Sequence, residues 1–195
     1  MTNGKLDRRA QRTRELLGQA LTELMAERSY DSITVQDITE RANVGRTTFY
    51  THFTSKLDLY LHAHFEAVAR LGQDSLTMDQ LLAPDPPEYF VKFLELIAQD
   101  RSTQLSLGLS QDVLMIARAM RQHVAEIIER CLRERFQEQS SQVPFTLVAN
   151  YLGGAQVELV SWWLESHSRL TPQELAGFYQ RFQRVTLLDT LQLQG

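Results

Sequence analysis

Two short amphipathic segments within residues 34–53 constrain the fold of this chain more than any other feature. Thr34 and Asp37 have the spacing of a capping box, which starts a helix. Asn43 tolerates the left-handed backbone that ends a helix, and Gly45 can act as the N-cap of the next one. The pattern therefore predicts two helices joined by a tight turn.

The second of these helices has two chemically different faces. Phe49 and Phe53 are four residues apart, so they share a face that can pack inward. Another arc carries Arg46, Thr47, Tyr50 and Thr51. Arginine can pair with guanine edges or phosphate, threonine with phosphate or a thymine methyl, and tyrosine with phosphate oxygens. Two interpretations fit: a helix-turn-helix that presents this helix to the major groove of DNA, or a capped helix pair that is only a packed corner.

The residues from Ile33 to Leu59 form a longer pattern, which ends in Tyr50-x-His52-Phe53-x-x-Lys56. This pattern resembles the DNA-binding domain of the tetracycline-repressor (TetR) family, and its ending is far more distinctive than a generic helix pair. The resemblance covers roughly Arg9 to Phe65, about a third of the chain. It implies a sequence-specific transcriptional regulator that binds double-stranded DNA as a homodimer.

The resemblance also implies which side chains contact DNA. They are Thr34, Gln36, Arg46, Thr47, Thr48, Tyr50, Thr51, His52 and Lys56. The first two would touch phosphates or the groove edge, while the arginine and the other threonines would lie in or beside the major groove. Tyr50, His52 and Lys56 would hold phosphates. The chain departs from the family pattern at Asn43, Gly45 and Thr51, so the base preference of relatives cannot be carried over.

Apolar spacing along the chain predicts an all-α fold of about nine helices. Together with the resemblance, it implies an N-terminal three-helix helix-turn-helix domain, residues 1–66, with the motif at about 34–53. Residues 67–195 would form a helical ligand-binding and dimerisation domain. Other helices are expected at about 8–28, 56–74, 111–137 and 144–166, with one from Pro87 or Glu88 and a last one capped by Thr171. The cluster at Pro84-Asp85-Pro86-Pro87 must be a loop.

The last two predicted helices are long, and apolar residues lie on more than one side of each. Their main stripes are Phe145, Val148, Leu152, Ala155, Leu159 and Trp162, then Leu175, Phe178, Phe182, Val185 and Leu188. Tyr151, Trp163 and Leu187 fall outside these stripes, which predicts contact with partner helices. The family implies a two-fold dimer through a four-helix bundle, bound to a palindromic operator. Gly153 and Gly154 lie inside a helical pattern, so another helix is expected to approach closely there.

The charge of the chain is unevenly distributed. Its net charge is -4, yet residues 1–56 hold nine Lys/Arg against seven Asp/Glu, and residues 57–195 hold eleven against seventeen. Such asymmetry is expected when only one end of a protein meets phosphate. Basic residues gather near the N-terminus at Lys5, Arg8, Arg9, Arg12 and Arg14. This cluster is either a solvated helix start or a helix end that lies near the DNA backbone.

Several classes of protein and site are disfavoured. The single cysteine, Cys131, excludes an intrachain disulfide, fits a reducing cytoplasm and is expected in the core. No apolar run approaches the roughly 18 residues of a membrane span, and the basic N-terminus lacks the apolar region of a secretory signal. His62, His64 and Glu66 are too few to converge on a metal. We therefore expect a cytoplasmic protein without membrane contact, metal, cofactor or catalytic residues.

The family further implies a pocket for a small-molecule effector in the C-terminal domain. Candidate wall residues are Phe65, Phe90, Phe93, Met115, Met120, Tyr151 and Trp162. Each could equally be plain core, because the apolar lining of a pocket and an apolar core look alike in sequence. An effector that binds better to the conformation with wrongly spaced DNA-binding heads would weaken DNA binding.

The sequence is therefore compatible with three functions. The first is a dimeric repressor released by a small ligand. The second is a DNA-bound protein of the same fold that acts through a protein partner without an inducer. The third is a helical enzyme or ligand carrier with an incidental corner motif, which predicts no salt-sensitive DNA binding.

Overall fold

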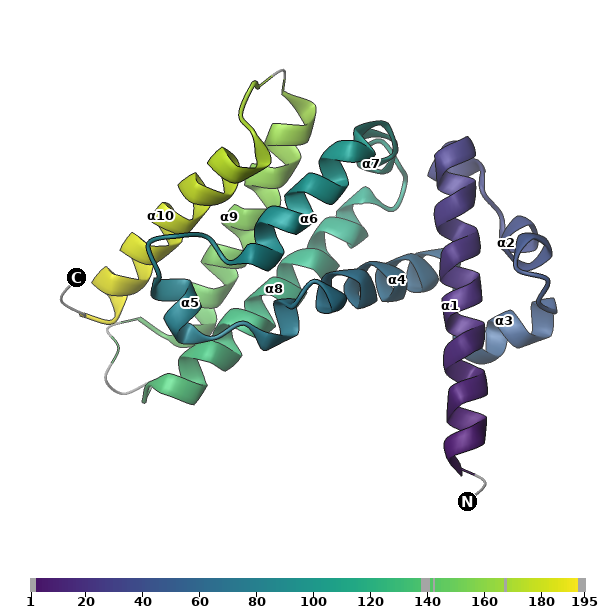
Figure 1. Cartoon of the computed structure of the whole chain (residues 1–195), viewed down its shortest axis with the longest axis horizontal. Coiled ribbons are helices and arrows are strands. Elements are labelled where there is room, and N and C mark those ends of the chain that lie inside the picture. Colours follow the sequence, from purple (N-terminus) through teal and green to yellow (C-terminus); the bar gives the residue numbers. More distant parts are fainter. Residues whose placement is uncertain (1–2, 138–140, 142, 167, 193–195) are drawn as a thin grey trace. The chain divides into compact units, whose positions relative to one another are not determined.

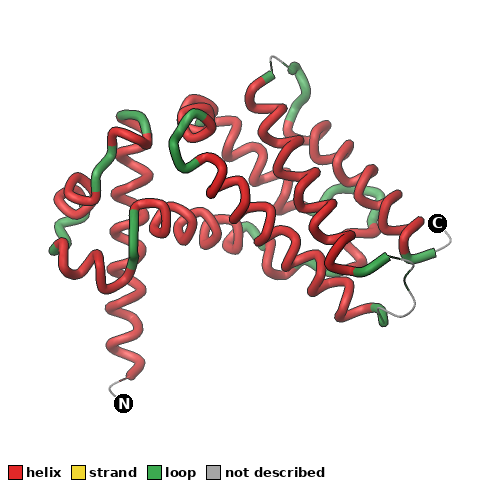
Figure 2. Tube along the Cα trace, turned by 180° about the vertical axis from the view of Figure 1, so that it is seen from behind, coloured by secondary structure: helices red, strands yellow, loops and turns green. Residues whose placement is uncertain are grey.

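The computed structural model describes residues 3–137, 141, 143–166 and 168–192, with side chains from Arg8 onward. Within these ranges the chain forms ten α-helices and two short 3-10 helices joined by loops, and it has no β-strand (Figures 1 and 2). The all-α fold expected from the sequence is confirmed, with ten α-helices where about nine were expected.

The helices belong to two compact units, which we call the head and the body. The head comprises Met1–Ala67 and Ser102–Val113, and the body comprises Val68–Arg101 and Leu114–Gly195. The head thus includes a short segment far along the chain from the rest of it. The functional boundary proposed after residue 66 stays a prediction.

The head is a small helical domain around one apolar core. It contains α1 (Asn3–Glu27), η1 (Tyr30–Ser32), α2 (Val35–Arg41), α3 (Arg46–His52), most of α4 (Lys56–Arg70) and most of α7 (Arg101–Gly108). Leu17 and Leu21 of α1, Ile38 of α2, Phe49 of α3 and Leu59 of α4 are all fully buried. Since α1 contacts both α2 and α3, this core holds the two short helices in a fixed arrangement.

The segment 102–113 is attached to the rest of the head by hydrogen bonds at both of its ends. The hydroxyl of Thr103 donates to the main-chain oxygen of Met25 over 3.4 Å. Near the other end, the hydroxyl of Tyr30 donates to Oδ2 of Asp112 over 3.0 Å. The residues that follow α1 are therefore held in part by a segment about 80 positions later in the sequence.

The body is a bundle in which the last helix contacts several others. It contains η2 (Gln73–Ser75), α5 (Met78–Leu82), α6 (Glu88–Gln99), α8 (Val113–Arg135), α9 (Phe145–Glu165) and α10 (Pro172–Thr190). Helix α10 packs against α5, α6 and α9 (Figure 1). It starts as expected, with a capping box between Thr171 and Glu174 and with Pro172 in the first turn.

The expected close approach of a second helix is confirmed at Gly153. A Cβ built there would lie 2.9 Å from the main-chain oxygen of Arg121 and 3.1 Å from the nitrogen of Ala125. Helices α8 and α9 therefore meet backbone to backbone, which only glycine permits. A Cβ at Gly154 would make an ordinary contact, 3.6 Å from the side chain of Arg121.

The predicted inward face of α10 is wrong in part. Leu175 is buried as expected, but Phe178, Phe182 and Val185 are 46%, 61% and 58% exposed. The buried face instead carries Tyr179, Gln180, Gln183 and Leu187. Gln180 can be buried because its amide donates to the main-chain oxygens of Gln80, Leu81 and Ala83, at the end of α5.

A similar exchange occurs at the end of α9. Trp162, expected on the core stripe, is 46% exposed, whereas Trp163 is 3% exposed and its indole N–H donates to the main-chain oxygen of Leu170. Tyr151 is 62% exposed, in agreement with its place outside the main stripe. Cys131 is a buried core residue, as predicted.

Two short helices were not expected from the sequence, and one helix was predicted too long. Helix α5 begins with a capping box of Thr77 and Gln80, a pattern that the sequence already contained. Helix α4 ends at Arg70, not near residue 74, because Gly72 takes a left-handed conformation with φ of 104°.

Candidate nucleic-acid interface

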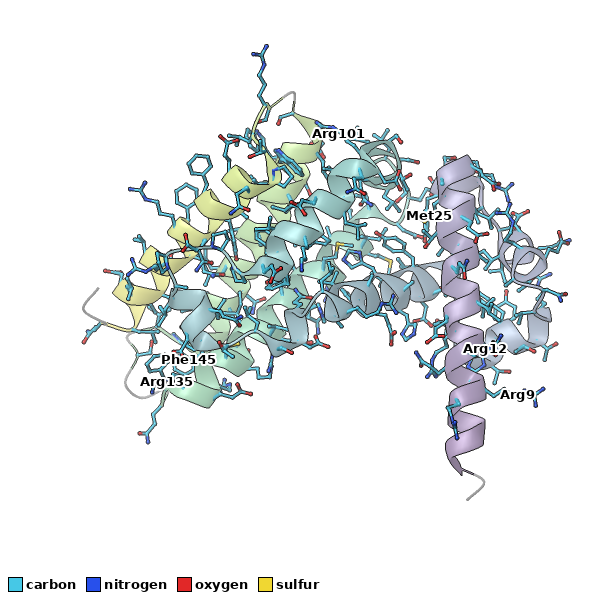
Figure 3. The ribbon with its side chains drawn as sticks, viewed as in Figure 1. Arg9, Arg12, Met25, Arg101, Arg135 and Phe145 are labelled. Atoms are coloured by element: carbon cyan, nitrogen blue, oxygen red, sulfur yellow. The ribbon has the colours of Figure 1, made fainter. Side chains whose placement is uncertain are left out.

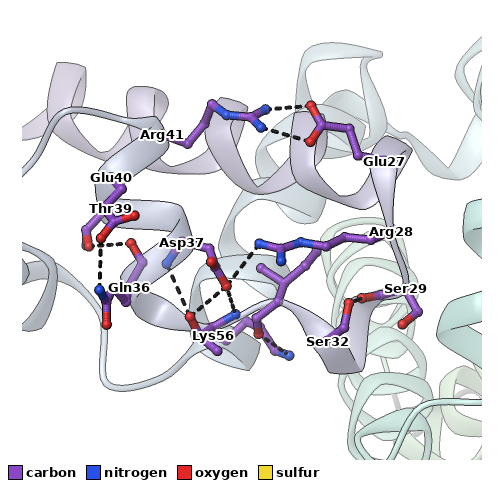
Figure 4. Close-up of polar contacts among 12 residues, drawn as sticks. Glu27, Arg28, Ser29, Ser32, Gln36, Asp37, Thr39, Glu40, Arg41 and Lys56 are labelled. Carbon is purple, nitrogen blue, oxygen red and sulfur yellow. Dashed lines mark hydrogen bonds and ion pairs between the residues drawn. The ribbon is translucent and has the colours of Figure 1, made fainter.

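The predicted capping box fixes the start of α2. Oγ1 of Thr34 accepts from the main-chain N–H of Asp37 over 3.2 Å, and the Asp37 carboxylate accepts from the N–H of Thr34 over 2.8 Å. Arg28 adds an ion pair to the same carboxylate at 3.0 Å (Figure 4). The hydrogen bonds from Thr34, followed by the one from Arg28, lower the pKa of Asp37 to about 2.

The turn between α2 and α3 has the predicted geometry. Asn43 takes a left-handed conformation with φ of 52°, and Gly45 is the extended N-cap of α3. The N–H of Val44 donates to the main-chain oxygen of Thr39 over 2.9 Å. The turn is therefore closed by the backbone, and the departures from the family pattern leave it intact.

Helix α3 separates an inner aromatic face from an outer polar one. Phe49 and Phe53 are 0% and 4% exposed, and their ring centroids lie 5.9 Å apart. The outer face carries Arg46, Thr47, Thr48, Tyr50 and Thr51, all exposed. The edge of the Tyr50 ring packs on Phe49, with centroids 5.3 Å apart, so this phenol is held from below while its hydroxyl stays accessible.

Other predicted DNA-contacting residues have partners within the head. The hydroxyl of Thr34 bonds to Asp37 and serves the cap. Gln36 is exposed, and its amide donates to Glu40 over 2.9 Å. His52 is partly buried, with its ring beside Phe53. These side chains remain predicted contacts, and DNA would have to share them with their present partners.

Lys56 has a structural role that the sequence did not reveal. Its Nζ donates to the main-chain oxygens of Tyr30 and Ile33, at 2.6 and 2.9 Å, and lies 4.0 Å from the centroid of the Tyr30 ring. Burial lowers the pKa of its ammonium, while the carboxylates of Asp31 and Asp112 act in the opposite sense. Two of its three donors therefore hold the residues around η1, and its predicted phosphate contact has one donor left.

Some basic residues of the head are engaged in ion pairs within it. Arg41 makes a two-pronged contact with Glu27, at 2.9 Å for each hydrogen bond (Figure 4), and Arg28 is paired as described above. By contrast, Arg9, Arg12 and Arg46 have no ionic partner among the described side chains. The positive charge available to a ligand is therefore concentrated at the start of α3 and in the first half of α1.

The residues predicted to line an effector pocket differ in burial, and the pocket stays a prediction. Phe90 is buried, and Phe93 and Met120 are partly buried in the body, while Phe65 is partly buried on α4 of the head. Met115, Tyr151 and Trp162 are 60%, 62% and 46% exposed, so their placement does not support a role as walls of a pocket inside one protomer.

His62 and His64 of α4 lie against aromatic rings. The ring of His62 lies against Phe53, with centroids 5.4 Å apart, and that of His64 lies 6.0 Å from Tyr60. No group of three or more His, Cys, Asp or Glu in the described part of the chain could hold a metal. None of the helices within the described ranges has the length and apolar character to cross a membrane.

Comparison with known proteins shows a family likeness in the N-terminal part of the chain. The family model "Bacterial regulatory proteins, tetR family" matches residues 18–63, which include all of α2 and α3. Over these residues the chain is similar to the TetR family. TetR-family proteins are transcriptional regulators, which agrees with the prediction that the chain is not an enzyme.

Related proteins extend the match beyond the head. An uncharacterized HTH-type transcriptional regulator of Bacillus subtilis, YxbF, is 26% identical over 185 residues, covering 91% of this chain and 46% of the relative. The chain therefore spans about half the length of that relative. A TetR transcriptional regulator from Streptococcus agalactiae is 25% identical with a TM-score of 0.56, covering 93% of this chain and 98% of that one. RolR, solved in complex with resorcinol, is 18% identical with a TM-score of 0.50, covering 96% and 97%.

Proposed function

We propose that this protein is a dimeric, sequence-specific DNA-binding repressor of the TetR family that a small molecule releases from its operator. The observation that carries the proposal is the outer face of α3. Arg46 and Tyr50 are exposed on it, directly above the buried rings of Phe49 and Phe53. A rigid helix that presents a cation, hydroxyls and a phenol is suited to the major groove.

The position of each side chain suggests its role at the DNA. Arg46 is the first residue of α3, and the N-terminal residues of a recognition helix are the ones that reach base edges. Thr47, Thr48 and Thr51 would lie in or beside the groove. Tyr50 and His52 would hold phosphates, with Thr34, Gln36 and the remaining donor of Lys56 at the margin.

Exposed apolar residues on α9 and α10 support the dimer. On α9 they are Leu147, Tyr151 and Trp162, and on α10 they are Phe178, Phe182 and Val185. Within each helix the spacing puts them on one side, and the two helices pack against each other. A second copy of the chain would cover these side chains, and its two-fold symmetry would present two heads to a palindromic operator.

Release by a small ligand is supported by fold likeness and by the aromatic character of the body. RolR binds resorcinol, which shows that a protein of this fold can hold a small aromatic molecule. In this chain the rings of Phe90 and Phe93 stack with centroids 6.4 Å apart, and Met120 is a further candidate. The effector would act by binding more tightly to a conformation that fits the operator poorly. Such a regulator would work in the cytoplasm, where its operator is accessible.

Selection of bound sequences from random duplexes, followed by titration of Arg46→Ala, tests DNA recognition. We expect a palindromic site, and we expect the variant to lose discrimination at one position by about 1–3 kcal/mol while remaining folded. Arg118→Ala, which removes an exposed arginine from α8 of the body, is the matched control and should bind like the wild type. Absence of any enriched sequence at low salt would overturn the proposal.

Sedimentation of the wild type, Phe182→Glu and Leu96→Glu tests the dimer. Phe182 and Leu96 are 61% and 51% exposed, but only Phe182 lies on the surface proposed to meet a second copy. We expect a wild-type dimer at micromolar concentration, dissociation by Phe182→Glu, and no effect of Leu96→Glu. A wild-type monomer, both free and on operator DNA, would contradict the proposed assembly.

A further inference from the structure

The first half of α1 carries basic residues but contributes little to the core of the head. Ahead of Leu17, no described side chain of α1 is buried, from Arg8 through Leu16. At 1.5 Å per residue, the stretch from Arg8 to Leu17 alone extends about 13 Å along the helix axis. Figure 1 shows α1 continuing well past α3 within the head. Packing of the core therefore does not explain why this stretch is present.

Two arginines of this stretch are not neutralised by other described side chains. Arg9 and Arg12 are exposed and have no ionic partner among the described side chains. Glu15, an acidic residue of the same helix, accepts from Gln11 over 3.2 Å. Arg14 is partly buried and donates to Gln11 over 2.7 Å. Arg9 and Arg12 are thus accessible cations of the stretch, and they lie three residues apart on one side of the helix.

That side of α1 is the one on which the helix pair lies. Figure 3 shows the side chains of Arg9 and Arg12 extending from α1 toward the side occupied by α2 and α3. Other cations of the head, Arg28 and Arg41, are engaged in ion pairs. The accessible guanidinium groups of α1 therefore extend toward the side of α1 on which α3 lies (Figure 3), and two unpaired guanidinium groups suit phosphate.

We propose that the first half of α1, through Arg9 and Arg12, binds DNA phosphates outside the base pairs read by α3. The inference rests on the proposed function, because its partner is the same DNA. It adds a second contact that is independent of sequence and lengthens the site that each head occupies. Arg9 and Arg12 supply affinity, whereas Arg46 supplies discrimination.

Titration of Arg9→Ala/Arg12→Ala on a selected duplex at several salt concentrations tests the inference. Each phosphate contact contributes about 0.9 to the slope of log affinity against log salt, so the double variant should lower that slope by about 1.8 per head. The advantage of the wild type should then shrink about twelvefold per head when salt rises fourfold. Arg9→Lys/Arg12→Lys should retain most of the slope, because it keeps both charges.

Two further measurements show whether the lost affinity belongs to this part of α1 and to the flanking DNA. Arg118→Ala/Arg169→Ala removes the same charge from exposed positions of the body and should leave the slope unchanged. Trimming the base pairs that flank the selected site should weaken the wild type and leave Arg9→Ala/Arg12→Ala unaffected. An unchanged slope in the double variant, or wild-type binding that ignores the flanks, would overturn the inference. If the wild type selects no sequence at all, the proposed function fails instead.

Discussion

Helix α3 of the head and helix α10 of the body have opposite arrangements of apolar and polar side chains. On α3, Phe49 is buried and Arg46 is exposed. On α10, Gln180 and Gln183 are 1% and 2% exposed, while Phe182 is 61% exposed. The comparison shows that a candidate binding surface can be recognised when its exposed residues differ in character from the buried residues of the same helix. On α3 the outer face is polar and includes the cation Arg46, whereas on α10 it includes Phe178 and Phe182.

The largest expected difference between the two helices is the cost of losing an aromatic ring. Phe49→Ala should destabilise the protein by about 3–5 kcal/mol, because it leaves a cavity in the core of the head. Phe182→Ala should change the stability of the monomer by less than about 0.5 kcal/mol, since the ring is exposed there. Both losses can be measured by denaturant unfolding at protein concentrations below the dissociation constant of the dimer. Equal losses would mean that Phe182 belongs to the core of the protomer.

The second prediction concerns Gln180, a polar side chain that is buried on α10. Gln180→Met keeps the size of the side chain but removes the donor to three main-chain oxygens at the end of α5. We expect a loss of about 1–3 kcal/mol, because the oxygens of Leu81 and Ala83 lose this donor, whereas that of Gln80 still accepts from the N–H of Ala83. Gln173→Met, at an exposed position of the same helix, is the control. A neutral effect at position 180 would show that water can replace the amide.

A smaller effect is expected at the buried tyrosine of the head. Tyr30→Phe removes the hydrogen bond to Asp112 and keeps the ring under Lys56. The loss should be about 1 kcal/mol in the free energy of unfolding. Tyr50→Phe removes an exposed hydroxyl of α3 and should leave stability unchanged while weakening DNA binding. If the two substitutions affect stability equally, the contact of the segment 102–113 contributes nothing to the head.

The smallest effect concerns the two capping boxes that contain a carboxylate, one in each unit. The pKa of Asp37 is lowered to about 2, by Thr34 first and then by Arg28. That of Glu174 is also lowered, by Thr171. For a carboxyl whose pKa is lower in the folded state, the stabilisation is complete above the unfolded value, near 4, and disappears as pH falls through the folded value. The stability difference between wild type and Asp37→Asn should therefore be flat above about pH 5 and decline toward pH 2.

Glu174→Gln provides the comparison, because the pKa of Glu174 is lowered by Thr171 without a contribution from an arginine. Unfolding of each variant at a series of pH values would provide the two curves. A difference for Asp37→Asn that grows as pH falls would contradict the assigned hydrogen bonds.

The sequence predicted the head more accurately than the body, because the features of the head depend mainly on residues close together in the sequence. The capping box of Thr34, the left-handed Asn43 and the buried Phe49 each depend on residues within a few positions. The double role of Lys56 depends on oxygens 23 and 26 residues away, and spacing along a helix carries no such information.

In the body, the same limitation appears as a wrong choice of face. Both sides of α10 are apolar enough to form a core, so periodicity could not rank Phe178 against Tyr179. The decision depends on partners distant in the chain, namely the main-chain oxygens at the end of α5. The same holds for the neighbouring tryptophans of α9, of which Trp163 has a hydrogen-bonding partner and is buried.

The segment 102–113 has a consequence for protein engineering. A fragment cut after Ala67 and grafted onto another scaffold would lack Asp112 and Thr103, so Tyr30 and the end of α1 would lose the groups that hold them. Chimaeras that exchange DNA specificity between relatives should therefore transplant two separate stretches of sequence. The sequence that must be transferred to preserve this head is discontinuous, although its recognition helix is only seven residues long.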